Sequence, residues 1–312
     1  MGFELLVLLL LAAVLLIWLR KPTSAAGRQR IQVNGAQRNY WVHRPHAAAS
    51  PAPVLLCFHG GGGRVERLRR SGIVEAAQRN GFVVVFPEAP GGWIDARPER
   101  GTSRRDLDFI EALLDRLRIT QGGANRFYAL GVSNGGMFVH RLGMEQPERF
   151  AGFATINASI PAAAVRGLPP PGPPVPIMLV FGRDDHLMPW AGGRIPMGRR
   201  PGMGVGGFVI SAEETLQYWL RRNRAQGEPT TRRMGGEHGP VEVRDYAAAP
   251  TGAPVRFVNI AGWGHQWPRW RGDADGNEAF DISDVVFEFF TRRPTVRPIL
   301  EAEPARVRLG EG

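Results

Sequence analysis

The sequence has a single cysteine, Cys57, and a single lysine, Lys21. One cysteine cannot form an internal disulfide, so no disulfide framework stabilises the fold. All but one of the 39 basic residues are arginines, and they are scattered along the chain instead of forming one stripe. No nucleic-acid-binding module accompanies them. We therefore interpret the formal charge of +10 as a solvated basic surface and expect no nucleic-acid partner.

Long apolar runs are missing except near the N-terminus, where residues 5–19 are all apolar and Arg20 and Lys21 follow. This segment predicts a targeting or anchoring device. It is shorter than the roughly 20 residues of a comfortable membrane span. Small residues at 24–26 suit signal-peptidase cleavage, whereas the lack of a basic stretch before the run favours an uncleaved anchor.

These features predict an exported or membrane-anchored protein, extracytoplasmic, that contacts the membrane through its N-terminal apolar segment if that segment is not cleaved. The positive-inside rule, applied to Arg20 and Lys21, would instead hold the following domain in the cytoplasm. The sequence leaves cleavage and orientation open. Nothing in it indicates internal repeats, and 312 residues suit one α/β domain of about 250 residues with extensions.

One stretch has the pattern of a catalytic serine turn. Residues 127–130 are apolar, Gly131-Val-Ser133-Asn-Gly135 follows, and a helical apolar period continues until just before Pro147. This order predicts strand, tight turn and helix, the setting of the Gly-x-Ser-x-Gly nucleophile elbow. A serine hydroxyl needs a base and donors for an oxyanion, so the elbow predicts both elsewhere. An ordinary strand-to-helix turn is the alternative.

A glycine-rich loop fits the oxyanion site. Residues 53–58 read as a strand covered on both faces, and His59 with four glycines follows directly. Consecutive glycines let backbone N–H groups approach a negative oxygen, so we expect Gly60, Gly61 and Asn134 to form the oxyanion hole. A phosphate-binding loop would need a Gly-Lys-Ser/Thr ending, which is absent. We expect His59 to shape this loop and not to act as the base.

The acid and the base are expected after later strands. Residues 177–181 read as a buried strand, and Asp184 and Asp185 follow it. The chain order Ser, Asp, His places the acid here and leaves open which aspartate it is. His265 follows the last predicted strand, residues 255–260. A histidine has the pKa to accept the serine proton and return it to the leaving group, so His265 is the predicted base.

Other patterns define the rest of an α/β fold. Alternating residues on both sides of Asn34-Gly35 predict a β-hairpin. The loop of residues 88–100 is expected to contact substrate, because it follows the carboxyl end of a strand. Further strands are expected at 81–87, 150–156 and 242–246, and helices at 73–78 and 281–290.

Two helices carry start signals. A 3.6-residue apolar period predicts a helix from Ser103, with Asp106 in the capping-box position. Ser211 and Glu214 form a second capping box before another amphipathic helix. Residues 273–277 resemble the start of a calcium loop, but their glycine falls two positions early, so we expect a helix cap and no metal.

Five motifs occur in a fixed order within residues 33–290. They are His59-Gly-Gly, Arg126-Phe-Tyr-Ala-Leu-Gly-Val-Ser-Asn-Gly-Gly-Met137, Phe181-Gly-Arg-Asp-Asp185 continuing to Pro189-Trp-Ala-Gly-Gly193, Ser211-Ala-Glu-Glu-Thr215, and Gly264-His-Gln-Trp-Pro268. Together they resemble the polyhydroxybutyrate depolymerase and feruloyl-esterase-like group of α/β-hydrolases. The resemblance implies a mostly parallel central sheet with helices on both faces. It also implies Ser133 as nucleophile, Asp185 as acid and His265 as base.

The expected function is that of a serine carboxylic-ester hydrolase acting on a small or oligomeric ester through an acyl-enzyme, without a metal or organic cofactor. The alternatives are an acyltransferase or peptidase on the same scaffold, or an inactive membrane-tethered binding protein. Trp93, Trp190 and Trp267 are the predicted substrate-binding residues, in an aromatic cleft that Trp263 would also line. Buried core positions are the alternative for all four tryptophans. We expect an anchor or signal at residues 1–22, a catalytic domain at 28–293 and a mobile tail at 294–312.

Overall fold

The computed structural model describes residues 27–45, 49–62, 64–166, 172–196, 206–235, 239–272 and 279–291. Three predicted segments lie outside these ranges: the anchor at 1–22, the calcium-like stretch at 273–277 and the tail at 294–312. No helix within the ranges has both the length and the apolar character needed to cross a membrane.

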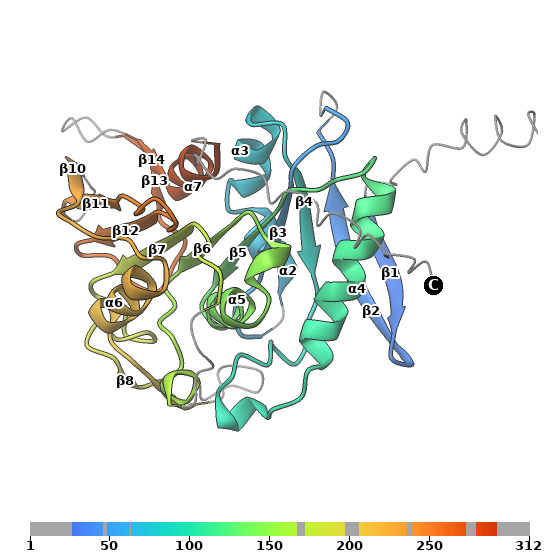
Figure 1. The fold of residues 1–312 in the computed structure, drawn as a ribbon, viewed down its shortest axis with the longest axis horizontal. Coiled ribbons are helices and arrows are strands. Elements are labelled where there is room, and N and C mark those ends of the chain that lie inside the picture. Colours follow the sequence, from blue (N-terminus) through green and yellow to red (C-terminus); the bar gives the residue numbers. More distant parts are fainter. Residues whose placement is uncertain are drawn as a thin grey trace, which may run out of the picture.

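A large sheet forms the centre of the molecule (Figure 1). Its strands are β1 (Gly27–Val33), β2 (Ala36–His43), β3 (Val54–Phe58), β4 (Val83–Pro87), β5 (Phe127–Val132), β6 (Gly152–Ile156), β7 (Ile177–Gly182), β10 (Thr230–Met234), β11 (Val241–Tyr246) and β12 (Val255–Ile260). Their spatial order is β1-β2-β4-β3-β5-β6-β7-β12-β11-β10. Pairing is parallel from β4 to β12 and antiparallel at both margins. The predicted mostly parallel α/β sheet is confirmed.

Helices cover both faces of the sheet (Figure 1). They are α2 (Val65–Arg69), α3 (Ile73–Arg79), α4 (Arg105–Thr120), α5 (Asn134–Glu145), α6 (Ala212–Arg222) and α7 (Ile282–Thr291). Helices α4, α5 and α6 contribute to one apolar core, and α2, α3 and α7 contribute to the other. The central strands are buried on both faces, which explains their continuous apolar sequences.

The described part of the fold also contains three short 3₁₀ turns and two small two-stranded ribbons. Three 3₁₀ turns span Pro98–Arg100, Pro147–Arg149 and Ala162–Val165. Two small ribbons pair β8 (Gly193–Arg194) with β9 (Phe208–Val209) and β13 (Arg269–Trp270) with β14 (Phe280–Asp281). The sequence analysis did not identify these ribbons, because strands of two residues have no measurable period.

The N-terminal hairpin and one capping box match the sequence prediction. Strands β1 and β2 join through Asn34 and Gly35, which both have positive φ as a type I′ turn requires. Ser211 accepts a hydrogen bond from the Glu214 N–H, and the Glu214 carboxylate accepts one from the Ser211 N–H. These local signals were sufficient because each motif is completed within four residues.

The predicted capping box at α4 was wrong. Arg104, not Ser103, is the N-cap residue, and no side chain caps the helix. Asp106 instead accepts a hydrogen bond from the Ile94 N–H and pairs with Arg38 at 2.9 Å. A partly buried arginine and a buried loop amide stabilise the carboxylate more than a cap would, so tertiary partners decide where Asp106 points.

The loops at one edge of the sheet are brought together by the parallel pairing. Strands β3, β5, β7 and β12 all run in the same direction, so their carboxyl ends meet at that edge. The segments that follow these ends begin with His59, Ser133, Arg183 and Ala261. All the catalytic residues predicted from the sequence therefore lie on loops of one edge.

Candidate active site

Ser133 occupies a strained turn between β5 and α5. Its backbone has φ 55° and ψ −123°, a conformation that costs a non-glycine residue on the order of 1–3 kcal/mol. The flanking glycines make the turn sterically feasible. A Cβ on Gly131 would lie 2.2 Å from the Gly135 carbonyl oxygen, and one on Gly135 would lie 2.3 Å from the Phe58 carbonyl oxygen. The serine is thus held at the end of the strand by a turn that only small neighbours permit.

Three side chains predicted to act together lie in one hydrogen-bonded chain. The distance from His265 Nε2 to Ser133 Oγ is 2.9 Å, and the distance from His265 Nδ1 to Asp185 Oδ2 is 2.6 Å. The aspartate side chain is 1% exposed and the histidine side chain 18% exposed. A histidine held in this way accepts a proton from the serine at one nitrogen while the carboxylate orients the other.

The two neighbouring aspartates have different environments. Asp185 is buried, and its Oδ1 accepts hydrogen bonds from the Leu187 and Met188 N–H groups, both at 2.8 Å. Asp184 is exposed, and its backbone N–H donates to the Trp263 carbonyl oxygen. The structure therefore brings Asp185 and not Asp184 to the histidine.

The glycine-rich loop after β3 lies against the serine. A Cβ added to Gly60 would be 3.4 Å from Ser133 Cβ and 3.9 Å from its Oγ. Gly61 follows in the same exposed turn. On the other side, Asn134 is the first residue of α5, where backbone N–H groups have no acceptor inside the helix. The glycine loop and the first turn of α5 thus both adjoin Ser133.

His59 fixes the shape of the glycine loop. Its Nε2 accepts a hydrogen bond from the Ala89 N–H at 3.0 Å, so its proton is on Nδ1, which donates to the Gly60 carbonyl oxygen at 2.8 Å. Burial lowers the pKa of His59, which keeps the ring neutral at pH 7. Because a peptide C=O and the next N–H point in opposite directions, holding the Gly60 carbonyl also orients the Gly61 N–H.

A buried polar network that the sequence analysis missed supports Asn134. The Asn134 side chain accepts from the Trp93 N–H at 2.8 Å and donates to the Trp93 carbonyl oxygen at 3.0 Å and to Asp95. Asp95 in turn pairs with buried Arg97 at 2.7 Å. The Asn134 side chain is therefore fully used, which leaves only its backbone N–H for an oxyanion. Asp95 and Arg97 lie in an irregular loop, where no sequence pattern indicates burial.

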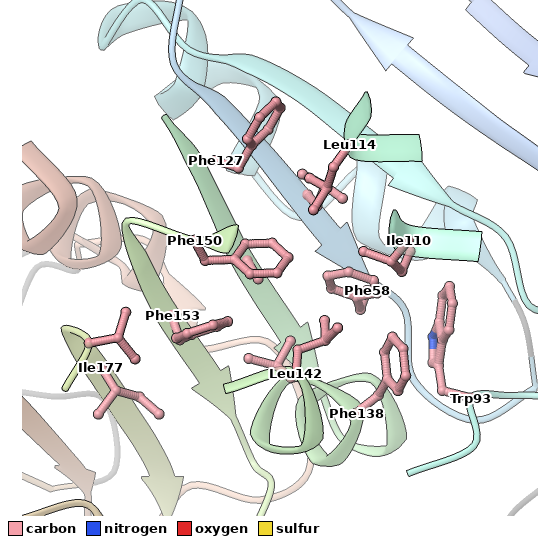
Figure 2. Packing of buried hydrophobic residues seen from close by; sticks show 14 of the residues in the cluster. Phe58, Trp93, Ile110, Leu114, Phe127, Phe138, Leu142, Phe150, Phe153 and Ile177 are labelled. Atoms are coloured by element: carbon pink, nitrogen blue, oxygen red, sulfur yellow. The ribbon is translucent and has the colours of Figure 1, made fainter. Parts of the chain in front are cut away.

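The tryptophan predictions need one correction. Trp93 is fully buried and stacks on Phe138 with 5.0 Å between ring centres (Figure 2). Its indole N–H donates to the His59 carbonyl oxygen, so Trp93 is a core residue and cannot contact substrate. The expected substrate-contacting loop at 88–100 is correspondingly buried at its centre. Trp263 is also buried. Trp190 and Trp267 are half-buried, and Trp267 lies two residues after His265.

A small apolar cluster joins the serine turn to the acid loop. It consists of Met137, Ala158, Met188, Ile195 and Val209, all buried. The Met137 N–H donates to the Ser133 carbonyl oxygen at 2.9 Å, so the cluster begins one helical turn after the serine. Within the described ranges, no group of three or more His, Cys, Asp or Glu side chains could hold a metal ion.

Known proteins resemble the chain in sequence and fold. The family described as alpha/beta hydrolase fold matches residues 53–172. A putative esterase, NocK, from Nocardia uniformis subsp. tsuyamanensis is 32% identical over 272 residues, which cover 80% of this chain and 76% of that protein. Feruloyl esterase B from Thermothelomyces thermophilus is 25% identical over 117 residues, 35% of this chain and 40% of that protein.

Among solved structures, an acetyl xylan esterase from Aspergillus awamori superposes with a TM-score of 0.57 at 15% identity, covering 84% of this chain and all of that one. At this identity the similarity concerns the fold alone. The sequence match to the Nocardia protein, in contrast, extends over most of both chains.

Proposed function

The chain belongs to the α/β-hydrolase fold family and is a hydrolase of carboxylic esters, and we propose that it works through a Ser133–His265–Asp185 triad and an acyl-enzyme. The observation that carries the proposal is the continuous chain from Ser133 Oγ through both ring nitrogens of His265 to Asp185. It provides a nucleophile, a base whose Nε2 lies 2.9 Å from the serine oxygen that carries the proton to be removed, and an acid that orients the base.

In the acylation half-reaction, Ser133 Oγ attacks the ester carbonyl carbon while its proton moves to His265 Nε2. The carbonyl oxygen becomes an oxyanion that the N–H groups of Gly61 and Asn134 stabilise, with Gly60 allowing close approach. Asp185 stabilises the imidazolium without taking its proton. Collapse of the tetrahedral intermediate breaks the ester C–O bond, and His265 returns the proton to the departing alcohol.

In the deacylation half-reaction, water takes the place of the alcohol. His265 Nε2 removes a proton from the water as its oxygen attacks the acyl carbon, and the same N–H groups stabilise the second oxyanion. The bond from the carbonyl carbon to Ser133 Oγ then breaks, and the proton returns to the serine. The acid is released and the enzyme is restored, so one water is consumed for each ester cleaved.

The finer assignment is to the polyhydroxybutyrate depolymerase and feruloyl-esterase-like group, with a small or oligomeric ester as substrate. Five sequence motifs in the expected order support it, as does the partial match to feruloyl esterase B. Trp190 and Trp267 are the aromatic side chains that remain as substrate-contact residues, because each keeps an exposed part. Hydrolysis of methyl ferulate compared with hydroxybutyrate oligomers would distinguish these substrates.

The Ser133→Ala variant tests the proposal. We expect it to lower kcat for p-nitrophenyl butyrate by at least about 10⁴-fold, because the nucleophile is lost while the fold is retained. A fluorophosphonate probe should label the parent protein and not the variant.

Ser103→Ala serves as the control, since Ser103 is an exposed serine before α4. It should keep both activity and labelling. Full activity of a folded Ser133→Ala protein would contradict the triad proposal.

A further inference from the structure

Asn157 lies between the nucleophile and acid loops, at the end of β6. This strand is the neighbour of both β5, which leads to Ser133, and β7, which leads to Asp185. The Asn157 N–H donates to the Val180 carbonyl oxygen in β7 at 2.8 Å, and the preceding carbonyl, of Ile156, accepts from the Ser133 N–H at 3.0 Å. The backbone at this point therefore connects the ends of three strands.

The side chain of Asn157 connects a fourth segment, the loop that carries His265. Its Nδ2 donates to the carbonyl oxygens of Gly264 at 3.2 Å and Gln266 at 3.1 Å, the residues on either side of the histidine. Its Oδ1 accepts from the Gly182 N–H at 3.1 Å, at the end of β7. The residue is 1% exposed, so these bonds form away from water.

We propose that Asn157 is a positioning residue for His265: its amide fixes the backbone on both sides of the base relative to the end of β7. The inference rests on the proposed triad. Asp185 orients the imidazole ring, but it does not touch the backbone that carries the ring. Further contacts of this loop include the bond from the Asp184 N–H to the Trp263 carbonyl oxygen and the bond from the Trp263 indole N–H to the Gln266 carbonyl oxygen.

The residue type suits this role in two ways. An asparagine side chain provides two donor hydrogens and an acceptor, whereas an aspartate offers acceptors only. The backbone of Asn157 has φ 49°, a left-handed conformation that asparagine tolerates better than most residues. The loop packs closely against the end of β7, because a Cβ on Gly182 would lie 2.3 Å from the Trp263 carbonyl oxygen.

The Asn157→Gly variant tests the proposal, because glycine keeps the left-handed backbone and removes only the amide. We expect kcat for p-nitrophenyl butyrate to fall about 10- to 100-fold, since a displacement of the base by about 1 Å has an effect of this size. KM should stay within about twofold, because Asn157 is buried beneath the loop and does not reach the ester.

A matched control is Asn223→Gly. Asn223 is also buried, and it exchanges two hydrogen bonds with the Val175 backbone before β7, at the opposite edge of the sheet. Both variants should lose thermal stability, but Asn223→Gly should keep its kcat. Equal losses of kcat in the two variants, or an unchanged kcat in Asn157→Gly, would overturn the proposal.

A double-mutant cycle shows whether Asn157 acts through the base. In a His265→Ala background, Asn157→Gly should change the residual rate by less than about twofold, because there is no imidazole left to position. A full further 10-fold loss would contradict the proposal. Should Asn157→Gly not fold, Asn157→Asp replaces it with the same expectation. The aspartate keeps a side-chain oxygen that accepts from the Gly182 N–H and loses the two donors to the Gly264 and Gln266 carbonyl oxygens. An inactive Ser133→Ala beside a fully active Asn157→Gly would refute only this inference.

Discussion

Asp185 shows how much of a proposed catalytic role depends on the surroundings of one side chain. Both of its oxygens are engaged, Oδ2 by His265 and Oδ1 by the Leu187 and Met188 N–H groups. Hydrogen bonds from backbone donors hold the carboxylate in one orientation. Asp184 has the same chemistry and an exposed side chain. Burial, backbone hydrogen bonds and position relative to His265 therefore separate two residues of the same type.

Replacing each aspartate in turn tests this distinction. Asp185→Asn should lower kcat by about 10⁴-fold, because an amide cannot stabilise the imidazolium and favours the wrong tautomer of His265. Asp184→Asn should leave kcat within about twofold. Both are measured with p-nitrophenyl butyrate at pH 7.5. A large loss in Asp184→Asn together with an active Asp185→Asn would show that the acid has been misassigned.

At the scale of elements, a buried histidine links two helices behind the site. The Trp219 indole N–H of α6 donates to His140 Nδ1 in α5 at 3.0 Å, so the proton of His140 is on Nε2, which donates to the Ala158 carbonyl oxygen at 3.0 Å. Ala158 follows Asn157 directly. The helix pair and the end of β6 are thus joined by one neutral ring, and a second proton on that ring would face the indole N–H.

This contact predicts a pH dependence of stability. Burial lowers the pKa of His140 from 6.5 to about 4. Above pH 6.5 the residue is neutral in both the folded and the unfolded state. Between pH 6.5 and 4 only the unfolded state gains the proton, so the free energy of unfolding falls as pH falls, by on the order of 3 kcal/mol over the window.

Urea unfolding at pH 7, 5.5 and 4.5 measures this contribution. The parent protein should lose more stability on acidification than His140→Gln, because the variant has no buried imidazole to protonate. His186→Gln, at an exposed histidine, controls for the loss of a histidine as such. Parallel pH curves for the parent and His140→Gln would rule out the effect.

At the scale of the whole molecule, the parallel centre of the sheet determines where chemistry is possible. Segments as distant in sequence as Gly60, Ser133, Asp185 and His265 meet because four parallel strands end at one edge. Two separate apolar cores, one on each face, hold that edge rigid. The catalytic side chains can then lie within hydrogen-bonding distance even though they are on loops.

Removing residues 1–26 tests the predicted anchor at the same scale. Every proposed catalytic side chain lies between Gly60 and His265, so we expect the shortened protein to keep its kcat/KM within about twofold. It should also lose the membrane association that the apolar run at 5–19 predicts for the full chain. Membrane sedimentation and esterase assays on both fractions measure the two effects.

A second variant shows whether membrane association depends on the apolar character of residues 5–19 or on the length of the chain. The double variant Leu8→Arg with Leu11→Arg interrupts the apolar run without shortening the chain. Like the shortened protein, it should no longer sediment with membranes. A shortened protein that still sediments with membranes would contradict the predicted anchor.

Patterns that are complete within a few residues were predictable from the sequence. The elbow around Ser133, the hairpin turn at Asn34 and the cap at Ser211 each depend on neighbours close in the chain. Asp106 and Trp93 were assigned incorrectly for the opposite reason. Their positions depend on Arg38, Asn134 and other partners that are distant in sequence.

The sequence by itself determined the order of most strands and helices, the residue types at the site and the glycines that the tight turns require. Only the tertiary structure decided between Asp184 and Asp185, because both have the same side chain and differ in what they face. Only it revealed Asn157, whose three partners lie 25 to 109 positions away in the chain. Hydrogen bonds depend on distance in space, and folding alone brings those groups together.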